Sequence, residues 1–438
     1  MDQTEALIIE TIDRHREEIL EFARDIYSHA ELGYKEFQTS GKFVKKMEQL
    51  GLRTEKGFAI TGVKAYLNED KKENASLALL GELDALRIPE HAFANPETNA
   101  AHCCGHHAQM AGVFGAALAL TVPEIAEKLD GQVVFFATPA EEYGEIEFKN
   151  QLREQGKIRY GGGKCELLRI GAFDDIDLCL THHIRPGNEI LVGSGTGNGF
   201  VSKVIRVLGK ASHAAGAPEK GVNALSAASL GLQALGLNRE TFRDEDCVRV
   251  HPIITKGGNL VNVIPDEVVV ETLVRGKTIE AFTDAAKKTD RSFKAGAIAM
   301  GAKVEISTLP GYLPTLAEEA LPELKHAAEI SASGIPVIEA SGHAGGSTDV
   351  GDVQHLMPVY TFNTGGVKGG LHQIDFEVTD EEEAYIVTAK MFALAAYGLL
   401  KEKAQRSREL GDQYEPVFKN SAEYVEFMEQ FDSKEIFE

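Results

Sequence analysis

The chain has 438 residues, of which 43% are hydrophobic and 26% are charged, a composition typical of a soluble globular protein. This length predicts two or three domains at ~100–200 residues each. The formal net charge of −22 argues against nucleic-acid binding, which depends on a basic surface, but it does not exclude a small anionic substrate.

Composition also bears on membranes and on the cellular compartment. No run of ~18 apolar residues occurs, so we expect no membrane-spanning helix and no membrane partner. Residues 1–20 are acidic and amphipathic, unlike a secretory signal peptide. The five cysteines are an odd number in a long chain, which argues against a disulfide framework and predicts a reduced, cytoplasmic protein.

The predicted elements begin with two helices within residues 5–53, the second closed near Gly51. Four short apolar runs, each ending in polar residues, are expected to be strands: 76–86, 131–142, 176–184 and 357–366. Nearly continuous apolar strands that alternate with helices indicate an α/β fold with a mostly parallel sheet and helices on both faces. Ligands of such sheets bind beyond the carboxyl ends of the strands.

The segment between the third and fourth apolar runs has a different order of predicted strands and helices. Residues 196–309 predict the order strand–helix–strand–strand–helix–strand, which is a complete small α+β (βαββαβ) domain. We therefore expect a catalytic domain formed by residues 1–195 and 310–438, interrupted by an inserted domain of residues 196–309. The charged tail after Ala404 is expected to wrap the surface or to serve assembly.

Candidate metal ligands are concentrated in the stretch HCCGHHAQM, residues 102–110. Cys104 and His106 have the spacing C-x-H, which by itself favours a core thiol and a helix-capping imidazole over a pair of ligands. Adjacent Cys103 and Cys104 close a strained ring and lack the C-x-x-C spacing, so a redox dithiol is disfavoured. A metal site requires further ligands from elsewhere in the chain.

Two other strand ends supply suitable groups. In PAEE, Glu141 and Glu142 follow a buried strand, where they are either acids at a helix N-terminus or one metal ligand and one base for a bound water. In THHIRPG, neighbouring strand residues point to opposite faces, so one imidazole is expected to bind. We assign that role to His183, with His182 in the core or behind the site.

The late motif GGVKGGLHQIDF presents His372 after a glycine-rich loop, where glycines allow close backbone approach to a ligand. Four other histidines show no comparable pairing and are expected to be structural or solvated: His29, His91, His343 and His355.

The order of these motifs resembles the M20 metallopeptidases. It comprises C-G-H, P-A-E-E, H-x-x-P, then G-K-x-S-H-A-A-x-x-P-E-x-G-x-N-A-L, and a late L-H. Within that family the chain is similar to the amidohydrolase branch, which includes aminoacylases, auxin-conjugate hydrolases and aminobenzoyl-glutamate hydrolases. LLGELDAL and GSTDVGDV look nearest to the B-subunit type of aminobenzoyl-glutamate hydrolase. The resemblance extends over nearly the whole chain.

The resemblance implies a two-metal centre and a role for each matching residue. Cys104 would bridge the ions as a thiolate, and the other ligands would be His106, Glu142, His183 and His372. Glu141 would be the general base, and Asp84 an orienting carboxylate. One thiolate, several imidazoles and a carboxylate fit Zn²⁺ or Mn²⁺, with one or two ions per subunit.

The inserted domain would serve dimerisation and cover the site. His213, in GKASHAAGAPE, matches the histidine that reaches the oxyanion of the partner subunit in the family. Asn262 and Arg275 match substrate-contacting positions, and Arg275 would clamp a carboxylate. The implied partners are a small substrate bearing a carboxylate and a second copy of the chain in a homodimer or higher oligomer, or a sister subunit.

The chain departs from the branch at several positions. The branch commonly reads C-G-H-D-x-H, whereas this chain has His107 and Gln109, and Glu82 stands where the strand motif commonly has Asp. The segment after PAEE is longer than the family's short link. We expect this segment to be a lid, with residues 161–163 as its glycine hinge.

The sequence thus predicts a metal-dependent amidohydrolase of N-acyl or N-aroyl amino acids. Two alternatives remain at this point. One is hydrolytic release of ammonia from a non-peptide C–N bond, and the other is a catalytically silent partner subunit.

Overall fold

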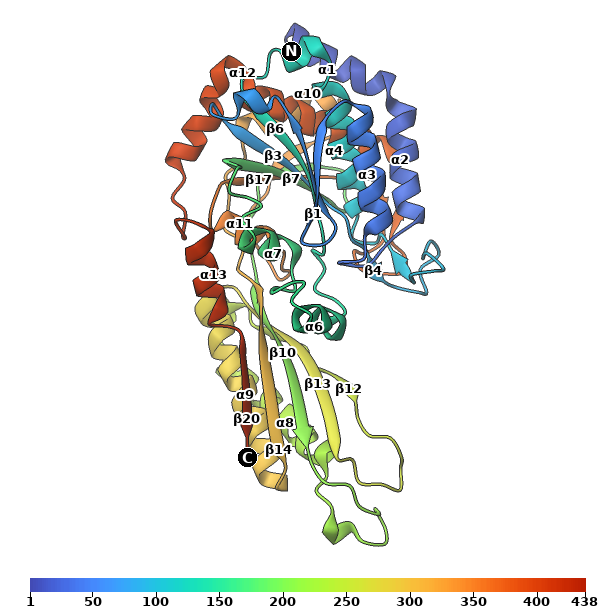
Figure 1. Cartoon of the computed structure of the whole chain (residues 1–438), viewed down its shortest axis with the longest axis vertical. Helices are drawn as coiled ribbons and strands as arrows, with labels where there is room; N and C mark the ends of the chain where they lie inside the picture. Colours follow the sequence, from blue (N-terminus) through green and yellow to red (C-terminus); the bar gives the residue numbers. More distant parts are fainter. The chain divides into compact units, whose positions relative to one another are not determined.

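An eight-stranded mixed sheet forms the centre of the first of two units in the computed structural model, which describes residues 1–438 (Figure 1). The four central strands are parallel, whereas both edges carry antiparallel pairings. The strand order is β1 (Arg53–Phe58), β2 (Gly62–Leu67), β6 (Gln132–Thr138), β3 (Ser76–Glu82), β7 (Leu178–Ile184), β17 (Val359–Thr364), β8 (Ile190–Val192) and β15 (Val337–Glu339). The predicted α/β fold with a mostly parallel sheet is confirmed.

Alternation along the strands sends side chains to both faces of the sheet. In β6, Val133 and Phe135 join the main core cluster, and Phe136 faces the other way and packs against Phe173, with ring centroids 5.1 Å apart. After β6 the chain forms two short helices, α6 (Ile146–Glu154) and α7 (Gly163–Arg169), and every residue of β6 is buried. Both faces are therefore buried, which explains why these strands read as continuous apolar runs.

The N-terminal region forms three helices where the sequence predicts two. These are α1 (Gln3–Arg14), α2 (Arg16–Ser28) and α3 (Phe37–Gln49). The first predicted helix breaks at His15, whose φ of −95° and ψ of 13° end α1, although the apolar periodicity continues across it. Asp2 and Glu5 form a reciprocal capping box that starts α1.

Helix α4 (His106–Leu120) is buried along its whole length and packs against helix α12 (Thr388–Gln413). Two glycines permit this approach. A Cβ on Gly112 would lie 2.5 Å from Cγ2 of Thr388, and one on Gly115 would lie 2.5 Å from Cβ of Ala389. The N-terminus of α4 is consequently held at a fixed place beyond the sheet, which matters because His106 is its first residue.

One helical stretch, Glu382–Gln413, is long and apolar enough to cross a membrane by length and composition. Its most apolar window is 89% buried inside the protein, where it packs against α4 and α10 (Pro322–Ser331). This burial accounts for its apolar character, and the helix belongs to the core of the first unit.

The second unit contains an antiparallel sheet with two helices on one face. Its strands are β11 (Arg249–Val250), β12 (Ile253–Lys256), β13 (Glu267–Gly276), β10 (Gly199–Leu208), β14 (Lys303–Tyr312) and β20 (Ser433–Phe437). The helices are α8 (Ala224–Asn238) and α9 (Ile279–Met300). Alternate residues of β13, such as Val268 and Val270, are buried in a core shared with Phe293 of α9.

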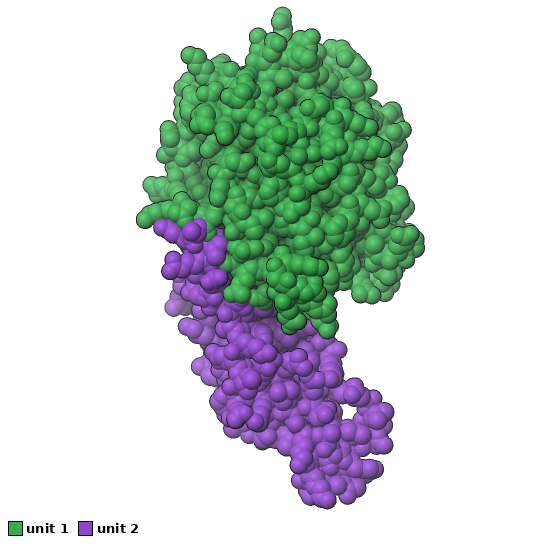
Figure 2. All heavy atoms as spheres, viewed as in Figure 1, with its two compact units in different colours: residues 1–195, 316–342, 352–421 green, residues 196–315, 343–351, 422–438 purple.

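The two units are residues 1–195, 316–342 and 352–421, and residues 196–315, 343–351 and 422–438 (Figure 2). The sequence places residues 422–438 in the catalytic domain, whereas the contacts place them in the second unit. The physical reason is that β20 pairs with β14, so the charged tail ends as an edge strand of the second sheet.

We expect Phe114→Ala to lower the free energy of unfolding by ~3–5 kcal/mol, because it opens a cavity in the fully buried face of α4. The Phe114 ring lies 4.8 Å from that of Phe22, centroid to centroid. Phe37→Ala is the matched control, since Phe37 is 63% exposed, and it should change stability by at most ~0.5 kcal/mol. Guanidinium unfolding followed by circular dichroism measures both. Equal transition midpoints would contradict this account of the core.

Candidate metal centre

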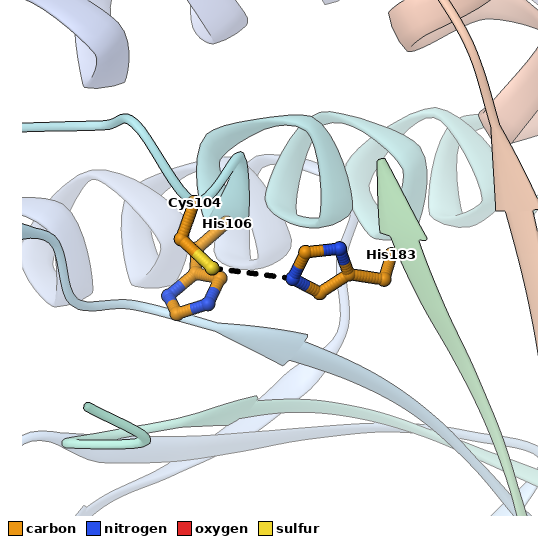
Figure 3. A group of neighbouring side chains, drawn as sticks. All are labelled: Cys104, His106 and His183. Carbon is orange, nitrogen blue, oxygen red and sulfur yellow. Dashed lines mark hydrogen bonds between the residues drawn. The ribbon is translucent and has the colours of Figure 1, made fainter. Parts of the chain in front are cut away.

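The thiol of Cys104 lies where α4 begins beside the end of β7. Gly105 makes the turn, with φ of 90°, and a Cβ there would lie 2.0 Å from Cγ2 of Ile184. Only glycine fits this left-handed and crowded position. As a result the Sγ atom of Cys104 lies 3.2 Å from Nε2 of His183 (Figure 3).

The two histidines of β7 point in opposite directions. Nδ1–H of His183 donates to the carbonyl of Ile184 over 2.7 Å, which leaves Nε2 directed at Cys104. His182 packs against Phe362 in the core, and its Nε2 lies 2.7 Å from the hydroxyl of Thr364. This geometry follows from strand alternation and agrees with the choice of His183 over His182 from the sequence.

The PAEE turn brings its carboxylates to the same place. Ala140 has a left-handed φ of 49°, and its N–H donates to Glu36 over 2.8 Å. A second hydrogen bond also fixes the turn: the N–H of Glu142 donates to Oδ2 of Asp84 over 2.9 Å. These two bonds orient the turn so that Oε1 of Glu142 lies 3.1 Å from Nε2 of His372.

His372 completes this side of the cluster. Its backbone is left-handed, with φ of 63°, and its N–H donates to the carbonyl of Cys103 over 2.9 Å. Nε2 of His372 lies 3.3 Å from Sγ of Cys104. The imidazole is half exposed, in contrast to the buried Cys104, so the cluster reaches the surface at this residue.

His106 is fully buried on the other side of Cys104. Its Nδ1 lies 2.9 Å from the carbonyl of Asp84 and 3.3 Å from Oδ1 of the same residue, so Nδ1–H is the donor. Nε2 is therefore the ring nitrogen that remains for a metal. It lies 3.1 Å from Oε2 of Glu82 and 3.9 Å from Oε2 of Glu141.

Burial and neighbouring charges shift the pKa values of this cluster. Burial, with a contribution from Glu142, raises the pKa of Cys104 well above its ordinary value. Burial also opposes charge on Glu82, but Lys164 outweighs it and lowers the pKa of Glu82 to about 2. For Glu142, burial is likewise outweighed by His372, which lowers the pKa of this carboxyl.

The imidazoles respond to the same balance in opposite ways. Burial and the charge of His106 lower the pKa of His183. Burial likewise opposes charge on His106, but Glu82 and Cys104 outweigh it and raise its pKa. The cluster therefore favours a neutral His183, as metal ligation requires, and holds His106 in strong negative potential.

The donor set fits a pair of divalent metal ions. Three groups each have their ligand atoms within 4.8 Å of one another: Cys104 with His106 and His183; Cys104 with Glu142 and His372; and Glu82 with His106 and Glu141. Nε2 of His106 and Oε1 of Glu142 are buried without a hydrogen bond, which is costly unless a cation binds there. Sulfur, imidazole and carboxylate donors suit Zn²⁺ and related ions.

The residues matched to oxyanion and substrate contacts lie in the second unit. His213 is in an exposed loop next to Asn262, whose carbonyl accepts the N–H of Ala214 over 3.0 Å. Arg275 of β13 donates to the hydroxyl of Ser347 over 2.9 Å and lies over the ring of Phe200. His213 and Asn262 thus lie side by side, on loops apart from the Arg275 strand.

The remaining histidines of HCCGHHAQM have structural contacts. His107 meets the hydroxyl of Tyr385 at 3.1 Å, and burial lowers its pKa to about 3. The ring of His102 lies 5.2 Å from that of His107. Of the histidines predicted to be structural, His91 is bonded to the carbonyl of Phe376, and His343 is bonded to Thr196 and Asn198.

Sequence reasoning misses two groups that contact the cluster. Lys164 is buried and its Nζ donates to Glu82 over 2.5 Å, although it lies in the segment expected to be a lid. Glu36 is buried beneath the PAEE turn, and burial with the charge of Asp84 raises its pKa to about 8. A lysine directly after three glycines was the available signal for the first; Glu36 offers none.

The glycine run 161–163 is packed rather than hinge-like. A Cβ on Gly163 would lie 1.6 Å from the carbonyl oxygen of Pro139, and one on Gly161 would lie 2.6 Å from the ring of Tyr143. The hydroxyl of Tyr34 also donates to the carbonyls of Tyr160 and Gly162. The glycines allow backbone contact with the PAEE turn, a packing role that the predicted hinge does not require.

Comparison with known proteins assigns the family. A model of peptidase family M20/M25/M40 matches residues 78–397. The chain belongs to this family. The M20 resemblance drawn from the motifs is confirmed, and the protein is a metallo-hydrolase that acts on C–N bonds.

This M20 hydrolase is similar to proteins of several specificities. The Xaa-Arg dipeptidase of Mus musculus is 27% identical over 408 residues, covering 90% of the chain and 85% of the relative. The IAA-amino acid hydrolase ILR1-like 2 of Arabidopsis thaliana is 30% identical over 272 residues, covering 60% and 56%. One chain of the p-aminobenzoyl-glutamate hydrolase of Escherichia coli is 27% identical over 315 residues, covering 70% and 60%.

Solved structures share the fold. A dinuclear metal-binding peptidase of the M20 family from Bacillus subtilis has a TM-score of 0.62 at 24% identity, covering 89% of this chain and 99% of its own. The aminobenzoyl-glutamate utilization protein of Klebsiella pneumoniae has a TM-score of 0.65 at 19% identity, covering 90% and 98%. The two-part architecture described above is that of the M20 fold.

The pKa of Glu36 predicts a pH effect that is independent of metal. Its carboxyl has a pKa of about 8 when folded and an ordinary value of 4.5, so the folded state binds the extra proton between these values and loses stability as pH rises through them. Glu36→Gln mimics the protonated acid. Measured by urea unfolding with a chelator present, the variant should gain stability relative to wild type between pH 5 and 8. A pH-independent difference would contradict this assignment.

Proposed function

We propose that the protein is a metal-dependent amidohydrolase that cleaves the amide bond of an N-acyl or N-aroyl amino acid through an activated water. The observation that carries the proposal is the buried Cys104 thiol, placed within 3.3 Å of imidazoles from two separate parts of the chain. A single sulfur between two sets of donors suits a ligand that bridges a pair of ions.

We assign the ligands by the groups that share Cys104. His106 and His183 would hold one ion with Cys104, and Glu142 and His372 would hold the other. The dinuclear M20 peptidase of Bacillus subtilis, named for its metal pair, supports this assignment. Zn²⁺ or Mn²⁺ is the proposed metal, because both accept imidazole and carboxylate ligands and Zn²⁺ also favours thiolate.

When bound, such an ion pair polarises the amide carbonyl and lowers the pKa of water. The chain's own groups supply the proton transfers. Glu141 is 8% exposed and neighbours the ligand Glu142, so its carboxylate accepts a proton from the attacking water and returns it to the leaving amine. Asp84 positions two of the proposed ligands, because it accepts one hydrogen bond from the backbone N–H of Glu142 and another from the ring of His106.

The substrate class rests on the relatives and on Arg275. The similar proteins are named for dipeptides, for indole-acetyl amino acids and for p-aminobenzoyl-glutamate, which all present a carboxylate beside the scissile amide. Arg275 is proposed to bind that carboxylate, with Asn262 as a further contact. The amine product of such a cleavage is an amino acid, and this distinguishes the activity from ammonia release.

A homodimer in a reducing cytoplasm is part of the proposal. All five cysteines are free in the fold, which suits a reduced compartment. The second unit exposes apolar side chains on strand β12 and the following loop, which suits an interface between copies: Ile253, Ile254, Leu260 and Val261.

His213 is proposed to donate a hydrogen bond to the oxyanion of a partner subunit. Its Nδ1 accepts the N–H groups of Ala215 and Gly216 over 3.2 and 2.9 Å. These bonds fix the tautomer, so Nε2–H is left as the donor that an oxyanion requires. The exposed loop and the donor tautomer support the role.

We expect Glu141→Gln to retain the metal and to lower kcat by ~10²–10⁴, because a general base speeds turnover without being needed for ligation. Glu142→Gln should instead lose metal, since it removes a ligand. Elemental analysis of both purified variants, with turnover of N-acyl amino acids, makes the comparison. If Glu141→Gln loses the metal and Glu142→Gln keeps it, the two carboxylates have the opposite roles.

His213→Ala should lower kcat by ~10²–10³, the usual effect of removing one oxyanion donor. If the donor crosses between subunits, mixing inactive His213→Ala with inactive Glu141→Gln restores activity, because one site of a mixed dimer has both groups intact. Subunit exchange is verified with differently tagged chains. Exchange without recovered activity would place His213 in the site of its own chain.

A further inference from the structure

The carboxylate of Glu82 lies at the metal cluster but outside the ligand set assigned above. Glu82 ends strand β3, is 3% exposed, and directs Oε2 at Nε2 of His106 over 3.1 Å. It belongs with His106 and Glu141 to one of the three groups whose ligand atoms lie within 4.8 Å of one another. The proposed function gives this carboxylate no role.

The contact between Glu82 and His106 brings a carboxylate oxygen and an imidazole nitrogen, both able to bind a metal, within 3.1 Å of each other. Nδ1–H of His106 is committed to Asp84, so Nε2 is the ring nitrogen that faces Oε2 of Glu82, 3.1 Å away. Nε2 of His106 has no hydrogen bond. A divalent ion that replaced the Nε2 proton would be within reach of both atoms, and His106 is one of the proposed metal ligands.

Other side chains fix the Glu82 carboxylate without using up Oε2. Lys164 donates to Oε1 over 2.5 Å. Gln109 donates to Oε2 over 2.8 Å, and its own Oε1 accepts the N–H of Glu82 over 2.8 Å, which closes a reciprocal pair. A carboxylate oxygen that accepts one hydrogen bond keeps a further lone pair, and metal-ligating carboxylates are commonly supported in this way.

We propose that Glu82 is an additional metal ligand, which gives one oxygen to the ion held by His106, and that Lys164 and Gln109 are positioning residues for it. The inference rests on the proposed metal centre and adds one oxygen donor to it. The lysine balances the added negative charge within the buried cluster.

The inference also links the departures noted in the sequence. A glutamate at position 82 is one methylene longer than the aspartate common in the branch, so its carboxylate extends further beyond the strand end. Gln109, in place of the common histidine, offers both a donor and an acceptor on one amide, as the reciprocal pair with Glu82 requires. The two unusual residues are therefore partners in one contact.

The test compares metal affinity in variants that leave no unpaired buried charge. Glu82→Gln combined with Lys164→Met neutralises both members of the ion pair and keeps the bond to Gln109. The matched control is Glu166→Gln with Arg169→Met, which neutralises a buried carboxylate and its partner 2.6 Å away in helix α7, without contact to a proposed ligand.

Each protein is loaded with Zn²⁺, and the affinity for each ion is measured by competition with a chelator. The Glu82 variant should bind one ion ~10–100-fold more weakly, and the control should match wild type. Loading with Co²⁺ gives a second readout, because the visible absorption gains intensity when the ion loses a ligand. Melting temperatures of the metal-free proteins establish that both variants fold.

The outcomes separate this inference from the proposed function. The ligand role would be overturned if wild type binds two ions and the Glu82 variant has unchanged affinity and an unchanged Co²⁺ spectrum. Glu82 would then be the structural counterion of Lys164. Wild type that binds no divalent ion would overturn the metal centre itself. If the double variant does not fold, Glu82→Asp keeps the charge and shortens the reach, and wild-type affinity in that variant also overturns the inference.

Discussion

The buried carboxylate of Asp84 is the constraint on which the arrangement of the site depends. The backbone carbonyl of Asp84 accepts a hydrogen bond from Nδ1–H of His106, at the start of helix α4. Oδ2 of Asp84 accepts a hydrogen bond from the N–H of Glu142, in the turn after strand β6. Asp84 itself follows strand β3 and is fully buried. One residue therefore fixes a strand end, a helix start and a turn relative to one another, and the donors of the metal cluster are set by those three elements.

The cluster concentrates acids in a place where water cannot screen them. Glu36, Glu82, Asp84 and Glu141 are all buried around the two histidines, and Lys164 balances part of their charge. Isolated buried charges are expensive, so divalent ions bound here would stabilise the fold as well as provide the chemistry. Burial and the charge of Asp84 raise the pKa of Glu36. The same excess of negative potential therefore acts on Glu36, which is not one of the proposed metal ligands.

The segment after PAEE is held by the site and in turn supports it. Lys149 of helix α6 is buried and donates to the carbonyl of Glu142 over 2.6 Å, and Lys35 pairs with Glu145 over 2.8 Å at the start of the same helix. The packed glycines bring the chain back against Pro139. These contacts pack the segment into the scaffold around Glu142.

The sequence by itself determined the α/β class, the βαββαβ order of the second unit and the list of candidate donors, because strand alternation, apolar runs and motif spacing are local properties of the chain. Alternation predicted that His182 and His183 point to opposite faces of the sheet. Tertiary structure decided what depends on distant partners. The pairing of β20 with β14, the packed glycines and the Lys164–Glu82–Gln109 contact all arise from segments far apart in sequence. Such contacts leave no period or spacing in the chain, so only the folded protein reveals them.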